Sequence, residues 1–231
     1  MSEQPLTDVL AGIPRLTPTL HNDTYDRISP AKTTFEAQGK TVLITAGGTG
    51  IGFEISKAFA EAGVARIIIV SRRPEPQAQA KQGLEDQFPD LKVETHSASV
   101  TDHAKINEIL QNAGDIDVLV ISHSYIHKMQ PGVFVPVAEM QQTYDTNVVA
   151  NFNIVQSYLS LPKPAAGTKT VIFVSSCSSH MQIPMHIGYG SSKAAFTQMM
   201  AFFAEENKVE DGVRLFSFHP GAFFTEETEK Q

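Results

Sequence analysis

The sequence contains a single cysteine and no tryptophan, and its apolar residues never form a long uninterrupted run. One cysteine cannot form a disulfide within the chain, and no apolar run reaches the ~18 residues that a membrane-spanning helix requires. The N-terminal residues also lack the basic start and the apolar stretch of a secretory signal peptide. We therefore expect a cytoplasmic protein without a membrane partner.

Positive charge is also scarce, since 18 Lys and Arg residues stand against 25 Asp and Glu residues, for a net charge of −7. This balance argues against binding to nucleic acid or to an anionic membrane surface. The 231 residues, 42% of them hydrophobic, suit one domain with a single buried core. The expected partner is a small-molecule substrate.

Residues 1–39 carry four prolines and scattered polar residues, and we interpret them as an N-terminal arm that has a short helix near 6–11 or is a disordered tail. In residues 40–231, short apolar runs alternate with longer amphipathic stretches. This alternation predicts an α/β fold, a single doubly wound Rossmann domain whose parallel sheet has helices on both faces. The predicted strands lie near 41–46, 66–70, 91–97, 117–121, 169–175 and 213–218, and two long helices near 137–160 and 187–208.

A glycine-rich turn, Gly47-Gly48-Thr49-Gly50-Ile51-Gly52, follows the first predicted strand and opens a helix that runs to about Ala62. Glycines let the backbone approach a pyrophosphate, and the start of a helix offers free N–H groups and the positive end of its dipole. The turn therefore predicts a phosphate-binding site, with a plain βα turn as the alternative.

A tyrosine and a lysine stand four residues apart in Tyr189-Gly-Ser-Ser-Lys193, on one face of a predicted helix. A phenol titrates near pH ~10, so it carries protons at neutral pH only where a nearby cation favours the phenolate. Lys193 can supply that cation. Ser176 ends the apolar run before this helix, and its hydroxyl could hold a substrate oxygen against the tyrosine. The alternative is a surface Tyr–Lys pair of little consequence.

Five motifs, each weak alone, occur together between Lys40 and Thr225: Thr45-x-x-x-x-Gly50-Ile51-Gly52, Asn147, Ser176, Tyr189-x-x-x-Lys193 and Pro220-Gly221-x-x-x-Thr225. In their order and spacing the motifs resemble the short-chain dehydrogenase/reductase family. The resemblance implies a nicotinamide cofactor and the interconversion of a ketone and a secondary alcohol.

The resemblance also implies a role for each residue. Tyr189 would donate or accept the proton, Lys193 would bind the nicotinamide ribose and lower the tyrosine pKa, Ser176 would orient the substrate carbonyl, and Asn147 would anchor the water of a proton relay. The residues expected to contact the cofactor are Thr45, Gly47, Thr49, Gly50, Ile51, Gly52, Ser71, Arg72, Arg73, Ser99, Val100, Ser122, Tyr189, Lys193, Pro220, Gly221 and Thr225.

Three departures from the family pattern bear on cofactor binding. Ala46 replaces the first motif glycine, which adds one methyl group near the cofactor. Ser122-His123-Ser124 replaces the usual Asn-Ala-Gly, so an imidazole stands where backbone normally packs against the dinucleotide. Ser99 replaces an acid that commonly contacts the adenine, which weakens that contact.

The fourth departure is length, because only six residues follow Thr225. Family members continue through a substrate-covering helix and a last strand, so the fold is expected to lack both and to expose segment 213–218 as a sheet edge. We predict that the N-terminal arm or a second subunit covers this edge. The family's subunits pair through two long helices, which implies a homodimer or higher homo-oligomer. An apolar stripe of Phe196, Met199, Met200 and Phe203 fits such a contact or the core equally well.

The second predicted strand ends in Ser71-Arg72-Arg73, where an NAD-preferring protein would place an acid to hold the ribose hydroxyls. Guanidinium groups bind phosphate oxygens in pairs, so the two arginines favour NADP(H) with its 2′-phosphate. A solvated arginine pair is the alternative.

Four histidines, His123, His127, His180 and His186, fall near the ends of the fourth and fifth strands, where doubly wound sheets bind ligands. No carboxylate spacing typical of a zinc site accompanies them, so we expect pocket or surface histidines and no metal. Cys177 is read as a small packed residue.

Three functions fit the sequence. The first is NADP(H)-dependent oxidoreduction of a small apolar molecule, with Tyr189 as general acid/base. The second is a degenerate member of the family that uses its Ser/Tyr/Lys pocket to isomerise, dehydrate or cyclise a substrate without redox chemistry. The third is a catalytically silent subunit that pairs with a complete homologue. Cofactor binding separates the first from the other two.

Overall fold

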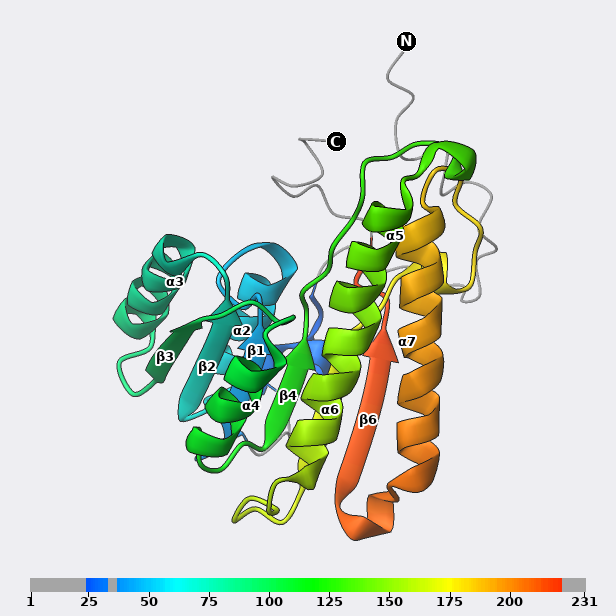
Figure 1. Ribbon diagram of the computed structural model, residues 1–231. Coiled ribbons are helices and arrows are strands. Elements are labelled where there is room, and N and C mark those ends of the chain that lie inside the picture. Colours follow the sequence, from blue (N-terminus) through cyan, green and yellow to red (C-terminus); the bar gives the residue numbers. More distant parts are fainter. Residues whose placement is uncertain (1–23, 33–36, 222–231) are drawn as a thin grey trace.

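The computed structural model describes residues 24–32 and 37–221. Six strands form one parallel sheet in the order β3-β2-β1-β4-β5-β6 (Figure 1). The α/β class and the doubly wound parallel sheet are therefore confirmed. The strands are β1 (Thr41–Thr45), β2 (Arg66–Ser71), β3 (Lys92–Ser97), β4 (Val118–Ile121), β5 (Lys169–Val174) and β6 (Val213–Phe218).

Helices connect the strands. The longer ones are α2 (Gly50–Glu61), α3 (Pro74–Gln87), α4 (His103–Asn112), α5 (Val137–Tyr144), α6 (Ala150–Ser160) and α7 (Ile187–Glu206), and a π-helix, η4 (Asp145–Val149), joins α5 to α6. Short 3₁₀ turns are η1 (Asp26–Ile28), η2 (Pro30–Lys32), η3 (Gly132–Phe134), η5 (Cys177–Ser179) and η6 (Val209–Asp211). The single helix expected over 137–160 was wrong in this respect, because five of its residues adopt π geometry.

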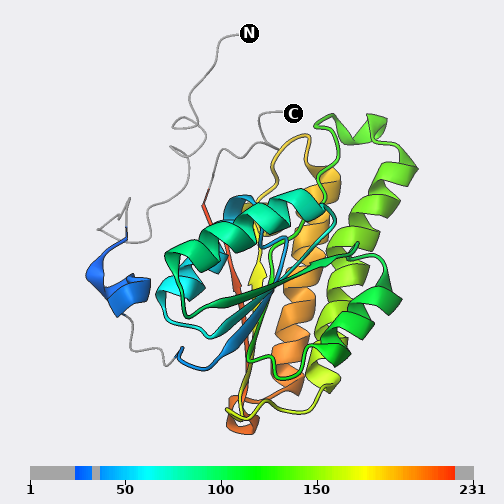
Figure 2. The same ribbon diagram turned by 90° about the vertical axis from the view of Figure 1, so that its left-hand side faces the viewer.

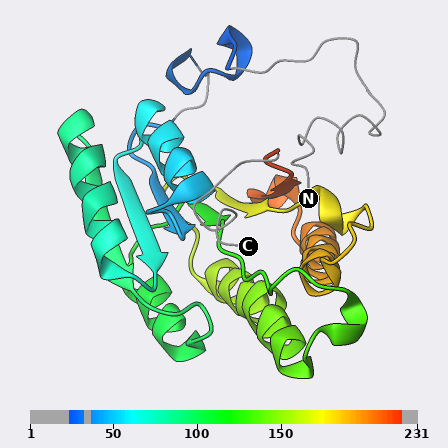
Figure 3. The same ribbon diagram turned by 90° about the horizontal axis from the view of Figure 1, so that it is seen from above.

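Two apolar clusters fill the two sides of the sheet. On one side α4, α6 and α7 contribute residues such as Ile106, Ile154 and Phe196, and on the other α2 and α3 contribute residues such as Ala60 and Leu84. Alternate residues of the central strands point to opposite clusters, as the two-residue period of a strand requires. Figures 2 and 3 show the sheet between these helix layers.

The stripe on α7 belongs to the first of these clusters. Phe196 and Met200 are buried there, and Met199 and Phe203 pack against it while partly exposed. The core interpretation therefore holds for the first pair. Phe202 and Phe152 remain exposed on the outer faces of α7 and α6.

Strand order determines where a ligand can bind. The chain runs outward from β1 through β2 to β3 and then crosses back to β4, which pairs with the other side of β1. The connections after β1 and β4 therefore leave in opposite directions and open a crevice at the carboxyl ends of these strands. Figure 3 looks onto this edge of the sheet.

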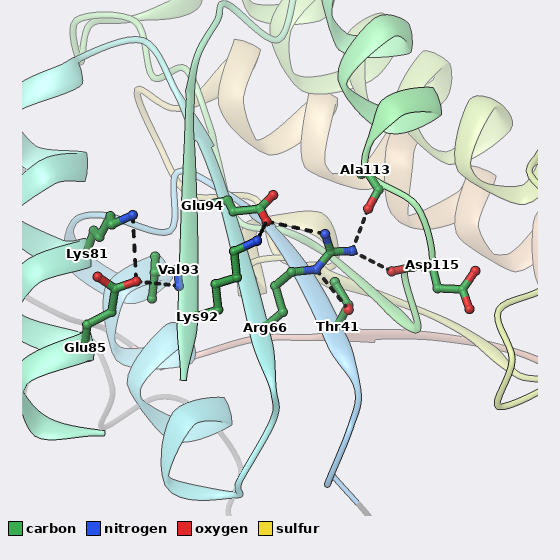
Figure 4. Close-up of polar contacts among 9 residues, drawn as sticks. All are labelled: Thr41, Arg66, Lys81, Glu85, Lys92, Val93, Glu94, Ala113 and Asp115. Atoms are coloured by element: carbon green, nitrogen blue, oxygen red, sulfur yellow. Dashed lines mark hydrogen bonds and ion pairs between the residues drawn. The ribbon is translucent and has the colours of Figure 1, made fainter. Parts of the chain in front are cut away.

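The opposite end of the sheet is held by a polar cluster around Arg66, the first residue of β2 (Figure 4). Its guanidinium group donates to the carbonyl oxygens of Ala113 and Asp115 and to the Thr41 hydroxyl, and it lies 3.5 Å from the Glu94 carboxylate. These partners come from the beginnings of β1 and β4 and from β3. One side chain thus joins four neighbouring segments.

A buried lysine of β5 binds the carbonyl groups at the C-terminal end of α6. Lys169 is 2% exposed, and its ammonium donates to the carbonyl oxygens of Tyr158, Leu159 and Leu161 at the end of α6. Of these carbonyls, Tyr158 O also accepts from the backbone N–H of Leu161 at 3.2 Å. The last carbonyl groups of a helix lack partners further along it, and a cation near a helix C-terminus is also favoured by the dipole. Burial lowers the pKa of this lysine.

Strand β6 is the last strand of the sheet within the described residues, and Phe216 and Phe218 on it are 54% and 40% exposed. The arm and its expected helix near 6–11 lie largely outside the described residues, as do residues 222–231. What covers β6 stays a prediction.

Candidate active site

The glycine-rich turn has the shape that a phosphate group requires. Gly50 begins α2 with a φ of 51°, and Thr49 before it forms no side-chain cap, so the helix start is open to a ligand. A Cβ atom on Gly52 would lie 2.2 Å from the carbonyl oxygen of Ala46. The buried Ser56 hydroxyl, which sequence reasoning missed, donates to Gly47 O at 2.9 Å and Gly52 O at 3.0 Å. The turn therefore fits a dinucleotide phosphate.

Ala46 has a φ of 55°, in the left-handed region that favours glycine. Its backbone N–H donates to Val70 O at 2.8 Å, which continues the pairing of β1 with β2. The substitution expected to add only a methyl group near the cofactor therefore also strains the backbone, at a cost of roughly 1–2 kcal/mol.

Ser71 is the last residue of β2, and Arg72 and Arg73 follow it at the edge of the crevice, where both arginines are exposed. Buried Gln77 on α3 holds this turn, because its Nε2 donates to Ser71 O at 2.9 Å and to Arg73 O at 3.1 Å. A Cβ atom on Gly48 would lie 3.3 Å from the Gln77 Cα, so the glycine-rich turn packs directly on α3. Sequence reasoning missed Gln77, which gave no signal beyond its place in a helix.

The turns after β3 and β4 supply three further predicted contacts. Ser99 shares a 2.8 Å hydrogen bond with Thr101, Val100 is buried, and the Ser122 N–H donates to Thr45 Oγ1 at 3.0 Å. Thr45 therefore joins the end of β1 to the turn after β4. Its hydroxyl lies at the crevice between the two strands.

His123 lies buried in the wall of the crevice. Its Nδ1 is 2.8 Å from Thr45 Oγ1, and its Nε2 is 3.3 Å from the carbonyl oxygen of Thr146. A carbonyl only accepts, so Nε2 carries the hydrogen and Nδ1 accepts from the threonine hydroxyl. Burial, with further contributions from the charges of Lys193 and Arg72, lowers the pKa of His123 to about 3. The ring is a neutral bridge from β1 to η4.

Asn147 is buried within the π-helix. Its Oδ1 accepts from Tyr125 N at 2.7 Å, and its Nδ2 donates to Tyr125 O at 2.8 Å and to Ser192 Oγ at 3.0 Å. The side chain thus fastens the loop after β4 to α7. The Asn147 carbonyl, in turn, accepts from the side chain of Asn151 at 2.6 Å.

Ser176, Tyr189 and Lys193 converge beside the carboxyl end of β5. Ser176 lies two residues after that strand; its hydroxyl donates to Ser178 Oγ at 3.2 Å and is near enough to the Tyr189 phenol to affect the phenol's pKa. The Lys193 ammonium donates to Val174 O at 2.8 Å and lies 4.7 Å from the Phe173 ring centre and 5.7 Å from that of Tyr189. The fold brings these three side chains, predicted to act together, to the same end of the sheet.

The pKa directions differ from the sequence expectation. Burial raises the pKa of the Tyr189 phenol, and the nearby Ser176 hydroxyl acts in the opposite direction. Burial also lowers the pKa of Lys193 to about 7. The lysine is therefore only partly charged near neutral pH, and the net shift of the tyrosine is upward where a downward shift was expected.

The remaining predicted contacts follow β6. Ser175 N donates to Phe218 O at 2.8 Å, so Pro220 and Gly221 continue from the edge where Ser176 lies, and Gly221 has a φ of 101°. Thr225 lies outside the described residues.

Two loops at the mouth of the site expose apolar side chains. The loop between η5 and α7 exposes Met181 and Met185, and the segment leading into α5 exposes Val133, Phe134 and Val137, the last of them 85% exposed. Both loops leave the carboxyl ends of strands that border the crevice.

The four histidines differ in their surroundings. His123 and His127 are buried, and both form hydrogen bonds. His180 is exposed, and the ring of partly exposed His186 lies 6.3 Å from that of Tyr189. Over residues 24–32 and 37–221, no group of three or more His, Cys, Asp or Glu side chains could hold a metal ion. No helix in the described ranges combines the length and apolarity needed to cross a membrane.

Comparison with known proteins shows the family to which the chain belongs. The family model for short chain dehydrogenases matches residues 40–231. The chain is 50% identical over 211 residues to the short chain dehydrogenase/reductase AacuD of Aspergillus aculeatus, covering 91% of this chain and 73% of that protein. It is 31% identical over 193 residues to a 3alpha-hydroxysteroid dehydrogenase of Mediterraneibacter gnavus, covering 80% and 74%. A short chain dehydrogenase structure from Salmonella enterica superposes with a TM-score of 0.76 at 19% identity, covering 85% and 80%.

The fold and the matches together define an oxidoreductase that uses a nicotinamide cofactor. The chain belongs to the short-chain dehydrogenase/reductase family.

Proposed function

We propose that the protein is an NADP(H)-dependent oxidoreductase that interconverts a ketone and a secondary alcohol on a small apolar molecule. The observation that carries this proposal is the convergence of Ser176, Tyr189 and Lys193 at the same end of the sheet as the open, glycine-lined start of α2. Family membership alone leaves the choice between NAD(H) and NADP(H) open.

The residues present suit NADP(H). The glycine-rich turn and the start of α2 would hold the pyrophosphate, and exposed Arg72 and Arg73 would pair with a 2′-phosphate. Gln77 fixes the backbone that carries both arginines. When bound, the nicotinamide supplies or accepts the hydride.

The proton is handled by the chain. Ser176 holds the substrate oxygen, and Tyr189 gives its phenolic hydrogen to that oxygen in reduction or removes a hydrogen from it in oxidation. Because Lys193 is buried beside the phenol, its positive charge stabilises the phenolate when the tyrosine has given up its proton. Asn147 keeps α7 in register with the loop after β4.

Two findings support an apolar substrate. The mouth of the site carries exposed methionine, valine and phenylalanine side chains. The relative from Mediterraneibacter gnavus is named for a hydroxysteroid. An apolar alcohol or ketone would bury these side chains on binding.

Cofactor titration tests the proposal. NADPH should raise the melting temperature more than NADH, because a ligand that binds only the folded state stabilises it. Arg72→Asp should weaken NADPH binding at least about tenfold, and Arg214→Asp, on the exposed start of β6, serves as the matched charge control. NADPH binding equal to wild type in Arg72→Asp would remove the case for the 2′-phosphate.

Turnover tests the proton carrier. Tyr189→Phe should keep NADPH affinity and lose roughly 10²–10⁴-fold in kcat, whereas Tyr25→Phe, outside the site, should match wild type. Absence of cofactor binding together with an activity that still needs Tyr189 would identify non-redox acid/base chemistry instead. If the protein neither binds a cofactor nor has an activity that depends on Tyr189, the remaining interpretation is a catalytically silent partner subunit.

A further inference from the structure

His127 is buried between the loop after β4 and the start of α7, outside the set of residues used above. It is 2% exposed. Its Nδ1 lies 2.8 Å from the carbonyl oxygen of Lys128, and its Nε2 lies 3.1 Å from the backbone nitrogen of Gly188. The carbonyl accepts and the backbone N–H donates, so the two neighbours require a hydrogen on Nδ1 and a lone pair on Nε2.

The contact provides a cap that α7 does not find locally. The first N–H groups of a helix have no partner within it. His186 occupies the N-cap position of α7 and forms no side-chain cap hydrogen bond. The ring of His127, 61 residues away in sequence, accepts the hydrogen bond that a local cap would otherwise accept.

Gly188 is fitted closely to this imidazole. A Cβ atom there would lie 2.7 Å from His127 Cδ2, 2.9 Å from its Nε2 and 3.0 Å from Met140 Sδ on α5. Backbone and ring are therefore in direct contact. Even an alanine at 188 would push the start of α7 away from the ring.

Tyr189 follows Gly188 directly. Three residues further along, Ser192 accepts from Asn147 Nδ2 at 3.0 Å. The turn that carries the tyrosine is thus anchored on both sides, by His127 before it and by Asn147 after it. A shift at either anchor moves the phenol relative to Ser176, which stands on a different element.

We infer that His127 is a positioning residue, which sets the place of the Tyr189 phenol by accepting the Gly188 N–H at the start of α7. This inference rests on the proposed function for its catalytic consequence. The structural part, that the ring determines the surroundings of Tyr189, can be measured without turnover.

The test compares His127→Gln with His127→Met. The two side chains have nearly the same length and shape, but only glutamine can place an acceptor near the Gly188 N–H. With tyrosines labelled at ¹³Cζ, the chain gives signals from 5 tyrosines, and Tyr189→Phe identifies the one of interest. The Tyr189 signal should move in His127→Met and stay at its wild-type position in His127→Gln.

The same pair is assayed for turnover with NADPH. His127→Met should lose on the order of 10²-fold in kcat, as expected when a reacting group is displaced by about 1 Å, and His127→Gln should stay close to wild type. If His127→Met does not fold, Gly188→Ala replaces it, since its methyl group displaces the same turn and should move the same signal.

Equal behaviour of the two His127 variants would overturn the inference, whether both keep or both lose the wild-type signal. An inactive wild type with the signals moving as described would reject the proposed function and leave the positioning role intact. Active wild type with an unmoved Tyr189 signal in His127→Met and in Gly188→Ala would reject the positioning role alone.

Discussion

The ammonium nitrogen of Lys193 lies 5.7 Å from the centre of the Tyr189 ring, one turn along α7. Lys193 is buried and Tyr189 is partly buried, and burial shifts their pKa values in opposite directions, upward for the phenol and down to about 7 for the lysine. Each group is thereby pushed toward its neutral form. Proton transfer requires the phenolate of Tyr189, and the ammonium of Lys193 stabilises it because the two charges are opposite. The phenolate is therefore easier to form beside the charged lysine than the raised pKa of the phenol alone suggests.

Lys193 should lower the stability of the fold at and below neutral pH. Its folded pKa of about 7 lies below the usual 10.5, so below pH 7 the native state must bury the charged form. Between those values the unfolded chain binds more protons, and stability rises with pH. Lys193→Met should therefore be more stable than wild type at pH 6 by on the order of 1–3 kcal/mol. Urea unfolding of both proteins at pH 6 and pH 9 should show a smaller difference in the free energy of unfolding at pH 9. A difference that grows with pH would contradict the prediction.

His123 should make the protein sensitive to acid. Its folded pKa of about 3 lies below the usual 6.5, so as the pH falls below 6.5 the unfolded chain takes up a proton that the native state resists. Stability is complete above pH 6.5 and is lost toward pH 3, by several kcal/mol in all. His123→Gln, which does not titrate, should show a smaller drop in melting temperature between pH 7 and pH 5. His103→Gln, at the start of α4, is the control, and an unchanged drop in the His123 variant would refute the assignment.

Ala46→Gly should stabilise the protein. Glycine relieves the left-handed strain at φ 55°, which stabilises the native state by roughly 1–2 kcal/mol. Glycine also makes the unfolded chain more flexible, which destabilises the native state by about 0.5–1 kcal/mol. The free energy of unfolding should rise by about 0.5–1 kcal/mol, as measured by chemical denaturation. Ala58→Gly, inside α2, should instead destabilise by about 1 kcal/mol. A loss of stability in both variants would mean that Ala46 is not strained.

Lys169→Met should destabilise the protein without altering cofactor affinity. The substitution removes the donor that the carbonyl groups of Tyr158, Leu159 and Leu161 share at the end of α6, and Tyr158 O keeps its backbone partner, Leu161 N at 3.2 Å. Each buried acceptor left unpaired costs about 1–3 kcal/mol, and water that enters the site offsets part of this cost. We therefore expect the free energy of unfolding to fall by about 2–4 kcal/mol. Denaturation gives the loss, and NADPH titration at low temperature gives the affinity. Weaker NADPH binding in the folded variant would show that the two ends of β5 are coupled.

The strands of the sheet could be predicted because each is marked by its own short run of residues in the sequence. Runs such as Ile67–Val70 are too apolar and too β-branched for anything but a buried strand, and the six strands lie within about two residues of their predicted positions. The π-helix Asp145–Val149 could not be predicted. Apolar residues recur through it much as in an α-helix, so the altered hydrogen bonding leaves no mark in the pattern.

The proximity of two candidate site residues could be predicted from the sequence, and the contacts that hold them in place could not. Tyr189 and Lys193 share one helical turn, which fixes their proximity from spacing alone. The contact between His127 and Gly188 joins residues 61 apart and depends on the path of a loop. The upward pKa shift of Tyr189 depends on burial, which no spacing reveals. Gln77 and Ser56 act through backbone carbonyls, whose positions exist only in the folded chain.

Within the described residues, those assigned to ligand binding lie toward the carboxyl ends of the strands, whereas Arg66 joins the segments at their amino ends. Loss of that guanidinium group would loosen the beginnings of β1, β2 and β4 and leave the crevice residues chemically unchanged. Inherited variation at Arg66 should thus alter how much of the protein accumulates in a cell while its choice of ligand stays the same.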